Sequence, residues 1–334
     1  MSFRAAVVGV GHLGRHHARI WSQLPGVELV AVSDLDSTRV GEVARDCGAK
    51  PLRDYRDIPE VDAVSVAVPT VGHHEVATHF LSRGIPVLVE KPMTTTSAQA
   101  EALVPLARQK KVHLQPGFVE RFNPALKAAS SILKRPRFIE AIRISPLQFR
   151  SLDIGVVMDL MIHDLDIVLW LAGAPVQRVE ALGVNVLTGH EDLAKVRLTF
   201  ANGCQADLTA SRIATKTVRE IRVFQEDAYL SLDYGEKRVK VCRKKGDPPR
   251  NPILLAGLLA ASGGDPKALM ARYLDLQDLP IDDEEPLAAE IRSFLAVVRD
   301  GAAAVVTGED ALAALKVAER IRQEIQAASS AAAR

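Results

Sequence analysis

A lysine that follows a predicted buried strand is the first residue of this sequence that could take part in chemistry. The apolar run at 87–89 ends on a charged pair, Glu90 and Lys91, and Pro92 comes next. Ligands of open parallel sheets bind outside the carboxyl ends of the strands. We therefore expect Lys91 to lie at a binding site, where its ammonium group can donate a hydrogen bond to a reacting oxygen.

Three glycines near the amino terminus form a second pattern, G-x-G-x-x-G, in the run Gly9-Val10-Gly11-His12-Leu13-Gly14. An apolar strand is predicted before this run and a helix after it, which is the context of a dinucleotide-binding loop whose glycines let the backbone approach a pyrophosphate. Asp34 ends the next predicted strand about 20 residues further on, the spacing at which a carboxylate meets the adenosine ribose hydroxyls. The alternative is that the glycines only end a strand, but this order of elements favours a cofactor site.

The cofactor itself is predicted from the residues around this loop. The carboxylate of Asp34 repels the 2′-phosphate of NADP, which favours NAD, although Arg39 stands near enough in the chain to keep NADP open. Loops after later strands border the same crevice, so we expect further cofactor contacts from Thr70, His73, Glu90 and Lys91. The neighbouring pair His73 and His74 does not predict a metal, because no third ligand stands nearby.

An aspartate and a histidine lie four residues apart in an otherwise apolar segment, Val156–Trp170. Polar groups in so apolar a helix need a partner or a wet cavity. Zinc would need a third and a fourth ligand that the chain does not offer, so no metal is expected. A buried, satisfied polar cluster is the interpretation we favour for Asp166, whereas Asp159 and His163 form a candidate acid–base pair.

Composition limits the class of protein. The 334 residues are 48% hydrophobic and 25% charged, with a formal net charge of +1, so neither nucleic acid nor an anionic membrane is expected as the main partner. Three scattered cysteines argue against a disulfide framework and for a reducing compartment. The amino terminus enters a strand without an apolar leader, so we expect a cytoplasmic protein.

The order of predicted elements divides the chain into two domains. Short β-rich runs alternate with helical stretches over residues 1–118, which predicts βαβ units and a parallel Rossmann sheet, an α/β domain. Residues 119–334 instead hold successive strands, with Asn202-Gly203 as a hairpin signal, and two closing helices over 284–300 and 308–327. This second part is predicted to be an α+β domain built on an antiparallel sheet.

These motifs, in this order, resemble the glucose-fructose oxidoreductase/inositol dehydrogenase (Gfo/Idh/MocA) family. The resemblance rests on the glycine loop, Pro69-Thr70 with His73, Glu90-Lys91-Pro92, and the Asp159–Asp166 segment with Trp170 and Gly173. It implies a Rossmann domain followed by an open-sheet domain that is often an oligomer interface, so a homo-oligomer, dimer or tetramer, is expected. It also implies that Lys91, Asp159 and His163 are catalytic and bind substrate. One departure is Ser151-Leu-Asp-Ile-Gly155, where many sugar-oxidising members have a glycine run.

Within the family, the chain is most similar to the subgroup that oxidises the 3-hydroxyl of UDP-N-acetylglucosamine, ahead of a transaminase on the way to diamino lipid A. The similarity lies in Glu120-Arg121-Phe122-Asn123-Pro124 and the Asp159–Asp166 segment. Arg121 and Asn123 are expected to hold a nucleotide-sugar, and Arg150 or Arg212 could meet its pyrophosphate unless each only forms a surface ion pair. Two rival interpretations stay open: a dehydrogenase of free sugars or inositols, and a non-catalytic NAD-binding redox sensor.

Overall fold

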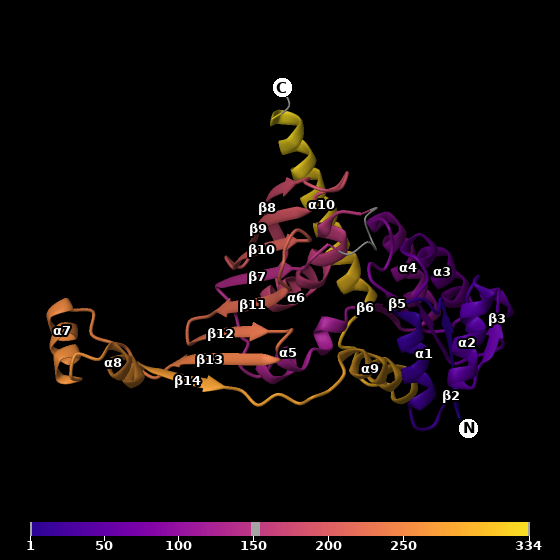
Figure 1. Ribbon diagram of the computed structural model, residues 1–334, viewed down its shortest axis with the longest axis horizontal. Helices are drawn as coiled ribbons and strands as arrows, with labels where there is room; N and C mark the ends of the chain where they lie inside the picture. The colour runs from indigo at the N-terminus through magenta and orange to yellow at the C-terminus, as the bar shows by residue number, and fades with distance from the viewer. Residues whose placement is uncertain (1, 148–153, 333–334) are drawn as a thin grey trace. The chain divides into compact units, whose positions relative to one another are not determined.

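The computed structural model describes residues 2–147 and 154–332, and these fold into two compact units (Figure 1). The first unit contains the chain up to Asn123 together with Leu165–Ile167 and Glu284–Gln323, and the second contains the remaining described residues. No single helix among these residues is long and apolar enough to cross a membrane.

The first unit is built on a six-stranded parallel sheet with the strand order β3-β2-β1-β4-β5-β6. This is the strand order of a dinucleotide-binding Rossmann fold, in which the order of the strands across the sheet reverses between β1 and β4. The strands are β1 (Phe3–Val8), β2 (Val27–Ser33), β3 (Lys50–Leu52), β4 (Ala63–Val66), β5 (Val87–Glu90) and β6 (Leu114–Gly117).

Helices and short turns connect these strands, and local sequence signals fix several of their ends. Asp36 caps α2 by accepting the backbone N–H groups of Thr38 and Arg39, and Gly48 ends that helix in the left-handed conformation. Thr96 caps α4 in the same way. The connecting elements are α1 (Gly14–Gln23), α2 (Ser37–Cys47), η1 (Tyr55–Asp57), η2 (Thr70–Gly72), α3 (His73–Ser82), α4 (Ser97–Lys110) and η3 (Val119–Phe122).

Two helices near the end of the chain belong to a different unit from the one that we predicted. We expected all of 119–334 to form the second domain, but α9 (Pro286–Asp300) and α10 (Gly308–Ala332) up to Gln323 belong to the first unit. The reason is packing: α9 buries an apolar face against α1, where Phe294 makes an edge-on contact with Trp21 at 6.3 Å between ring centroids.

The second unit is built on an eight-stranded sheet of order β14-β13-β12-β11-β7-β10-β9-β8. Its pairings are antiparallel except between β7 and β10, so the sheet is mixed and mostly antiparallel. The predicted hairpin at Asn202-Gly203 joins β9 to β10. The strands are β7 (Phe138–Ile144), β8 (Val176–Val184), β9 (Leu193–Phe200), β10 (Gln205–Ser211), β11 (Val218–Phe224), β12 (Ala228–Asp233), β13 (Arg238–Lys244) and β14 (Leu274–Asp278).

The two faces of this sheet differ. One face carries buried apolar residues such as Ile139, Leu208 and Leu230, and it is packed by α5 (Pro124–Ala129) over β12 and β13 and by η4 (Val157–Met161) over β10. The helix α6 (Ile162–Ala172) continues directly from η4. The opposite face carries half-buried and exposed side chains and has no helix over it among the described residues; we call it the open face.

Between β13 and β14 the chain makes an excursion of two helices, α7 (Pro252–Ala261) and α8 (Pro266–Tyr273), which meet at 112°. Figure 1 shows them projecting past the ends of β13 and β14, along the direction of these strands. No helix or strand is predicted from the sequence over this region. We call the two helices and the turn between them the arm.

Candidate active site

The glycine loop has the close backbone packing that its pattern predicts. Gly9 adopts φ +82°, and a side-chain Cβ there would lie 2.6 Å from the backbone nitrogen of Val68. A Cβ at Gly14 would lie 1.8 Å from the carbonyl oxygen of Gly9, so neither position can hold a larger residue. A Cβ at Gly11 would meet no described atom within 4 Å, which leaves the open side of the loop accessible to a ligand.

The amino terminus of α1, which directly follows this loop, is suited to an anion. Leu13 stands at the cap position and makes no side-chain capping hydrogen bond, and the first turn contains no acidic residue. The N–H groups of Arg15 and His16 donate to the carbonyl oxygens of Gly11 and Leu13, and the helix dipole favours a negative ligand at this end. His12 and Leu13 are both exposed beside the loop. The residues present thus fit the pyrophosphate of a dinucleotide.

Asp34 joins the end of β2 to the glycine loop. Its Oδ2 accepts the N–H of Val10 at 2.9 Å, and its Oδ1 accepts the N–H of Asp36 at 3.0 Å. The guanidinium of Arg39 lies 3.5 Å from Oδ1. A carboxylate held in this way is placed to meet a ribose, and the adjacent Arg39 means that the geometry does not decide between NAD and NADP.

His73 ties two loops at the carboxyl edge of the sheet together. Its Nδ1 lies 2.9 Å from the carbonyl oxygen of Pro92, and its Nε2 lies 2.8 Å from that of Val68. Burial lowers the pKa of this histidine, although its hydrogen bonds to the backbone of Pro92 and Val68 act to raise it. His73 therefore positions the loop that follows β5, and the contacts of His73 and Thr70 with a cofactor stay a prediction.

Glu90 is buried at the end of β5 and anchors the residue that follows it. Its Oε1 lies 2.9 Å from Nε2 of the buried His17 on α1, and its Oε2 accepts the backbone N–H of Lys91 at 3.2 Å. Burial acts to raise the pKa of Glu90, but the hydrogen bond and charge of His17 and the charge of Lys91 together hold it below its ordinary value. Glu90 is therefore an anion that fixes the backbone of the half-buried Lys91.

Asp159 and His163 lie where a π-helical turn, η4, runs into α6. Such turns occur often at functional sites because they redirect side chains within a helix. Both residues are half-buried, whereas Met158, Met161 and Ile162 around them are buried. The predicted acid–base pair is thus partly accessible in an apolar helix.

The start of this turn depends on residues that the sequence pattern does not reveal. The carbonyl oxygen of Glu191 accepts the N–H of Val156 at 3.0 Å, and Glu191 Oε1 accepts the N–H of Val157 at 3.3 Å. A Cβ at Gly155 would lie 1.8 Å from the same Oε1. Gly155 is therefore required for the approach of Glu191, although the two residues are far apart in sequence.

Two buried ion pairs flank His163 in the chain. Arg143 donates to both oxygens of Asp164 at 2.8 Å each. Arg121 donates to both oxygens of Asp166, at 2.6 and 2.9 Å, which confirms that Asp166 is a satisfied buried group. Burial raises the pKa of Asp166 to about 6, although the charge of Arg121 opposes this.

The side chains that we expect to contact substrate are placed as follows. Arg121 is buried and engaged by Asp166, and Asn123 donates to Glu120 Oε2 at 3.0 Å, so their direct contacts with substrate stay predictions. Arg212 is also buried and donates to the carbonyl oxygen of Ile154 at 2.6 Å, just before the π-helical turn. Arg150, like most of the atypical approach at 151–155, lies outside the described residues.

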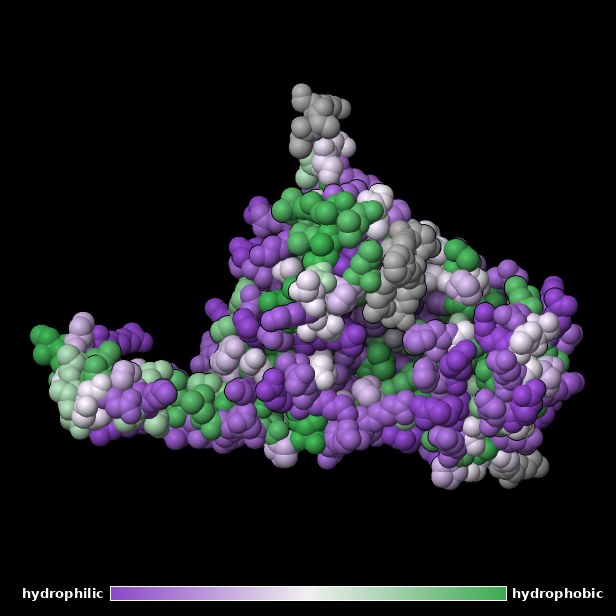
Figure 2. All heavy atoms as spheres, viewed as in Figure 1, coloured by the Kyte–Doolittle hydropathy of each residue, from purple (hydrophilic) through white to green (hydrophobic). Residues whose placement is uncertain are grey.

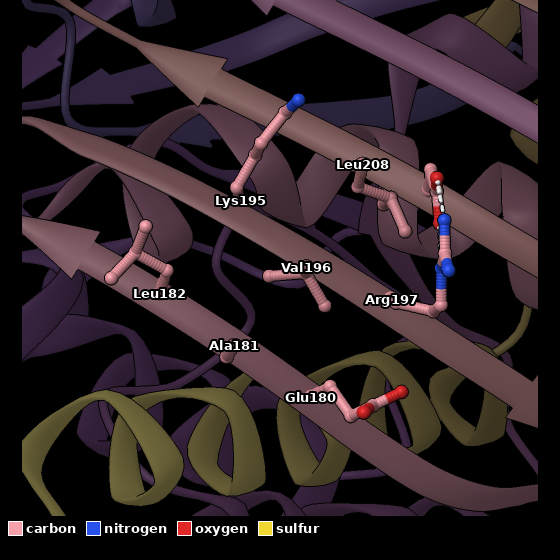
Figure 3. A pocket seen from close by; sticks show the side chains of 8 residues that line it. Glu180, Ala181, Leu182, Lys195, Val196, Arg197 and Leu208 are labelled. Atoms are coloured by element: carbon pink, nitrogen blue, oxygen red, sulfur yellow. Dashed lines mark hydrogen bonds and ion pairs between the residues drawn. The ribbon is translucent and has the colours of Figure 1, made fainter. Parts of the chain in front are cut away.

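A hollow of about 430 Å³ on the second unit holds none of these candidate residues. It lies over β8, β9 and β10, and Figure 3 shows Leu182, Lys195 and Arg197 among the side chains that line it. The guanidinium of Arg197 pairs with Asp207 at 2.6 and 2.7 Å. Because none of the candidate catalytic residues lines this hollow, we do not assign the active site to it.

Three features indicate an oxidoreductase that uses a nicotinamide dinucleotide. They are the Rossmann sheet, the glycine loop, and the charged pair Glu90 and Lys91 at the end of β5. Comparison with known families agrees. Residues 3–118 match the oxidoreductase family with an NAD-binding Rossmann fold, and residues 143–231 match the GFO/IDH/MocA C-terminal domain. The chain therefore belongs to the Gfo/Idh/MocA family of dehydrogenases, which act on sugar hydroxyls.

The chain is similar to several individual members of that family. It is 41% identical over 234 residues to the UDP-N-acetylglucosamine 3-dehydrogenase of Acidithiobacillus ferrooxidans, which covers 69% of this chain and 74% of that protein. A solved structure of that enzyme superposes with a TM-score of 0.86, at 32% identity over 98% of both chains. The scyllo-inositol 2-dehydrogenase (NAD(+)) of Bacillus subtilis is 26% identical over 338 residues, or 94% of this chain and 91% of that protein.

Proposed function

We propose that this protein is an NAD-dependent dehydrogenase that oxidises a secondary hydroxyl, the 3-hydroxyl, of a nucleotide-sugar such as UDP-N-acetylglucosamine to the keto-sugar. The observation that carries the proposal is the 41% identity to an enzyme with that name, together with retention of Lys91, Asp159 and His163. The oxidation removes a hydride from the carbinol carbon and a proton from its oxygen. When bound, NAD supplies the acceptor for the hydride.

Lys91 is assigned to the reacting oxygen. Its backbone is fixed through Glu90, and Glu90 is held in turn by His17. A cationic Nζ donating to the hydroxyl oxygen stabilises the negative charge that develops as the proton leaves. The buried carboxylate of Glu90 beside it favours the charged form of the lysine.

His163 is assigned as the general base. A neutral imidazole nitrogen can take the hydroxyl proton near neutral pH, because the unperturbed pKa of histidine is about 6.5. Asp159, four residues earlier on the π-helical turn, is assigned to orient the ring and to stabilise the imidazolium that forms.

Two partners belong to the proposal. Oxidation of an alcohol by NAD has an unfavourable equilibrium, so a downstream transaminase that converts the ketone to an amine would draw the reaction forward. We also propose that the protein is a homo-oligomer that pairs through the open face of the eight-stranded sheet. Support comes from the half-exposed aromatic contacts on that face, Phe138 with Phe224 and Phe224 with Tyr229.

The test is to incubate the purified protein with NAD or NADP and one substrate at a time, following the absorbance of reduced cofactor. We expect UDP-N-acetylglucosamine to reduce NAD, while glucose and myo-inositol do little. With glutamate and a transaminase added, mass spectrometry should find a 3-amino nucleotide-sugar. Strong turnover of a free sugar or inositol, with none of any UDP-sugar, would instead support the inositol-dehydrogenase rival, and NAD binding without turnover of any substrate would support the redox sensor.

A further inference from the structure

The loop between β8 and β9 reverses the usual distribution of apolar and acidic side chains. Val186 and Leu187 are exposed, and Figure 2 shows apolar surface over β8 and the loop after it. The two acidic residues at the end of this loop, Glu191 and Asp192, are instead buried. Because acidic side chains are rarely buried without partners, the contacts of these two carboxylates indicate what the loop is built to hold.

Asp192 holds the loop in one conformation. Its Oδ2 accepts the N–H groups of residues 186, 187 and 188 at 2.6–2.9 Å, and its Oδ1 accepts the hydroxyl of Thr188 at 2.8 Å. Burial acts to raise the pKa of Asp192, but these hydrogen bonds lower it to about 2, so the carboxylate stays charged at neutral pH. This internal anchor also fixes the residue beside it, Glu191.

Glu191 caps the helical segment that carries the candidate acid–base pair. Its carbonyl oxygen accepts the N–H of Val156 at 3.0 Å, and its Oε1 accepts the N–H of Val157 at 3.3 Å. Val156 stands at the cap position of η4 and makes no side-chain capping hydrogen bond. Glu191 therefore supplies, from a distant part of the chain, acceptors that a helix start ordinarily takes from its own cap residue. A carboxylate also suits the positive end of the helix dipole.

The carboxyl group of Glu191 lies directly over the backbone of Gly155. The three atoms nearest to a Cβ built at Gly155 all belong to that carboxyl group, at 1.8–2.2 Å. The φ angle of Gly155 is not positive, so the backbone conformation would accept alanine and the obstacle is the carboxyl group. A side chain at position 155 would therefore displace Glu191 from the start of η4.

Two arginines fix the chain on either side of the pair. Arg212, which directly follows β10, donates to the carbonyl oxygen of Ile154 at 2.6 Å, just before the π-helical turn. Arg143 on β7 donates to both oxygens of Asp164, the residue after His163, at 2.8 Å each. The turn is thus held at both ends by charged groups of the sheet. We call these groups the clamp, which consists of Glu191, Arg212 and Arg143.

The strand register explains why the clamp residues come together. β10 pairs with both β7 and β9, and Ser211 lies opposite Ile144 in one pairing and opposite Leu193 in the other. Each residue of the clamp is within two positions of one of these three. The clamp therefore comes from one end of three neighbouring strands, the end away from the arm, and η4 begins there.

We propose that Glu191 is a positioning residue for the acid–base pair Asp159 and His163. By fixing where the π-helical turn begins, Glu191 sets the direction in which both side chains leave the helix. The π-helix is rare and survives as single turns. Without this cap the segment relaxes toward α-helical hydrogen bonds and turns the pair away. The inference rests on the proposed function for what the pair does, but not for where the pair is held.

The first experiment measures turnover of the full chain with NAD and UDP-N-acetylglucosamine. Glu191→Ala should lower kcat by about 10²-fold, because a misplacement of about 1 Å at the reacting groups can cost that much. Glu191→Gln keeps an acceptor oxygen at the same place and should retain most of kcat. NAD binding should be unchanged in both variants. Glu226→Ala, at an exposed position near the other end of these strands, is the matched control and should leave kcat unchanged.

A double-mutant cycle separates positioning from a general loss of structure. Gly155→Ala displaces the same carboxyl group and should lower kcat as Glu191→Ala does. The double variant should lower kcat no further than Glu191→Ala alone, because the added methyl group then occupies the space that the carboxyl group leaves. Effects that add, or NAD binding that falls in parallel with kcat, would overturn the inference. Should Glu191→Ala not fold, normal kcat in Gly155→Ala would overturn it equally.

The second experiment needs no substrate. Diethyl pyrocarbonate modifies accessible neutral histidine rings, and mass spectrometry of peptides gives the rate at each histidine. Glu191→Ala and Gly155→Ala should raise the rate at the half-buried His163 severalfold, whereas Glu191→Gln should keep it, and the exposed His12 should react alike in every variant. An unchanged rate at His163 in both variants would overturn the inference. If no sugar is turned over by wild type, the proposed function fails, while this rate still decides the role of Glu191.

Discussion

Glu290 should make the protein less stable as the pH rises, and its replacement by glutamine should remove that effect. The residue lies on α9 in the first unit and is fully buried, and neither carboxyl oxygen has a hydrogen-bond partner among the described residues. Burial, and then the charges of Glu90 and Asp166, raise the pKa of Glu290 well above its ordinary value. The folded protein therefore keeps a proton on Glu290 at a pH where the unfolded chain has released it.

The sign and size of the effect follow from that difference. Because the folded state binds more protons than the unfolded state, the stability contributed by Glu290 is fully present below its unfolded pKa and is lost as the pH rises toward the raised value. Within this window the free energy of unfolding falls by about 1.4 kcal/mol for each pH unit. Glu290→Gln should lack this slope, so the difference in stability between wild type and the variant should grow as the pH rises above the unfolded pKa of Glu290.

Urea unfolding at several pH values, followed by tryptophan fluorescence, measures this slope. Trp21 is a suitable reporter because it is buried in the same unit and contacts Phe294 on α9. Glu42→Gln, at an exposed position of α2, is the matched control and should leave the slope of wild type unchanged. A difference between wild type and Glu290→Gln that is the same at every pH would refute the reasoning, because it would mean that folding does not alter the ionisation of Glu290.

Three further predictions concern the candidate site. Asp34→Ala should weaken NAD binding by about 1.5–3 kcal/mol, roughly tenfold or more, and NADP binding much less. Titration of both cofactors into wild type and the variant checks this prediction. Tighter binding of NADP than of NAD by wild type would show that the pocket is misassigned. Lys91→Ala and His163→Ala should each lower turnover by about 10²–10⁴ while NAD still binds, and near-normal turnover of His163→Ala would mean that another group is the base. Arg121→Ala should lower the free energy of unfolding in urea by about 3–5 kcal/mol, because it leaves the charge of Asp166 buried and unpaired. Unchanged stability with weakened substrate binding would instead favour direct contact of Arg121 with substrate.

The parts of the fold that sequence predicts best are those fixed by short-range signals. The G-x-G-x-x-G loop needs a glycine at position 14 because a Cβ there would meet the carbonyl oxygen of Gly9 within the same strand–turn–helix unit, so the motif and the structure agree. The Asn202-Gly203 turn is equally local. The polar residues inside the apolar segment at 156–170 also mark a site, because unpaired polar groups are costly in such surroundings.

The features that escape prediction depend on contacts between distant residues. Glu191 supports the π-helical turn only because Gly155 leaves room for its side chain. The sequence around either residue does not predict this contact. Glu290 occurs in a helical pattern where a glutamate would ordinarily face solvent, and only the packing of α9 buries it. The parallel pairing of β7 with β10 likewise joins strands that are not consecutive, which a sequence of hairpin signals does not indicate.

The position of α9 has a consequence for how the protein is made. Trp21 and Phe3 pack with each other in the first unit, and Phe294 from α9 completes the same cluster. A ribosome adds about 5–20 residues per second, so the roughly 170 residues between Asn123 and Phe294 take about 10–30 s to synthesise. During that interval the apolar surface of Trp21 and its neighbours that α9 covers stays exposed to chaperones and to aggregation. We therefore expect a chain that stops before α9 to aggregate more readily than the full-length protein.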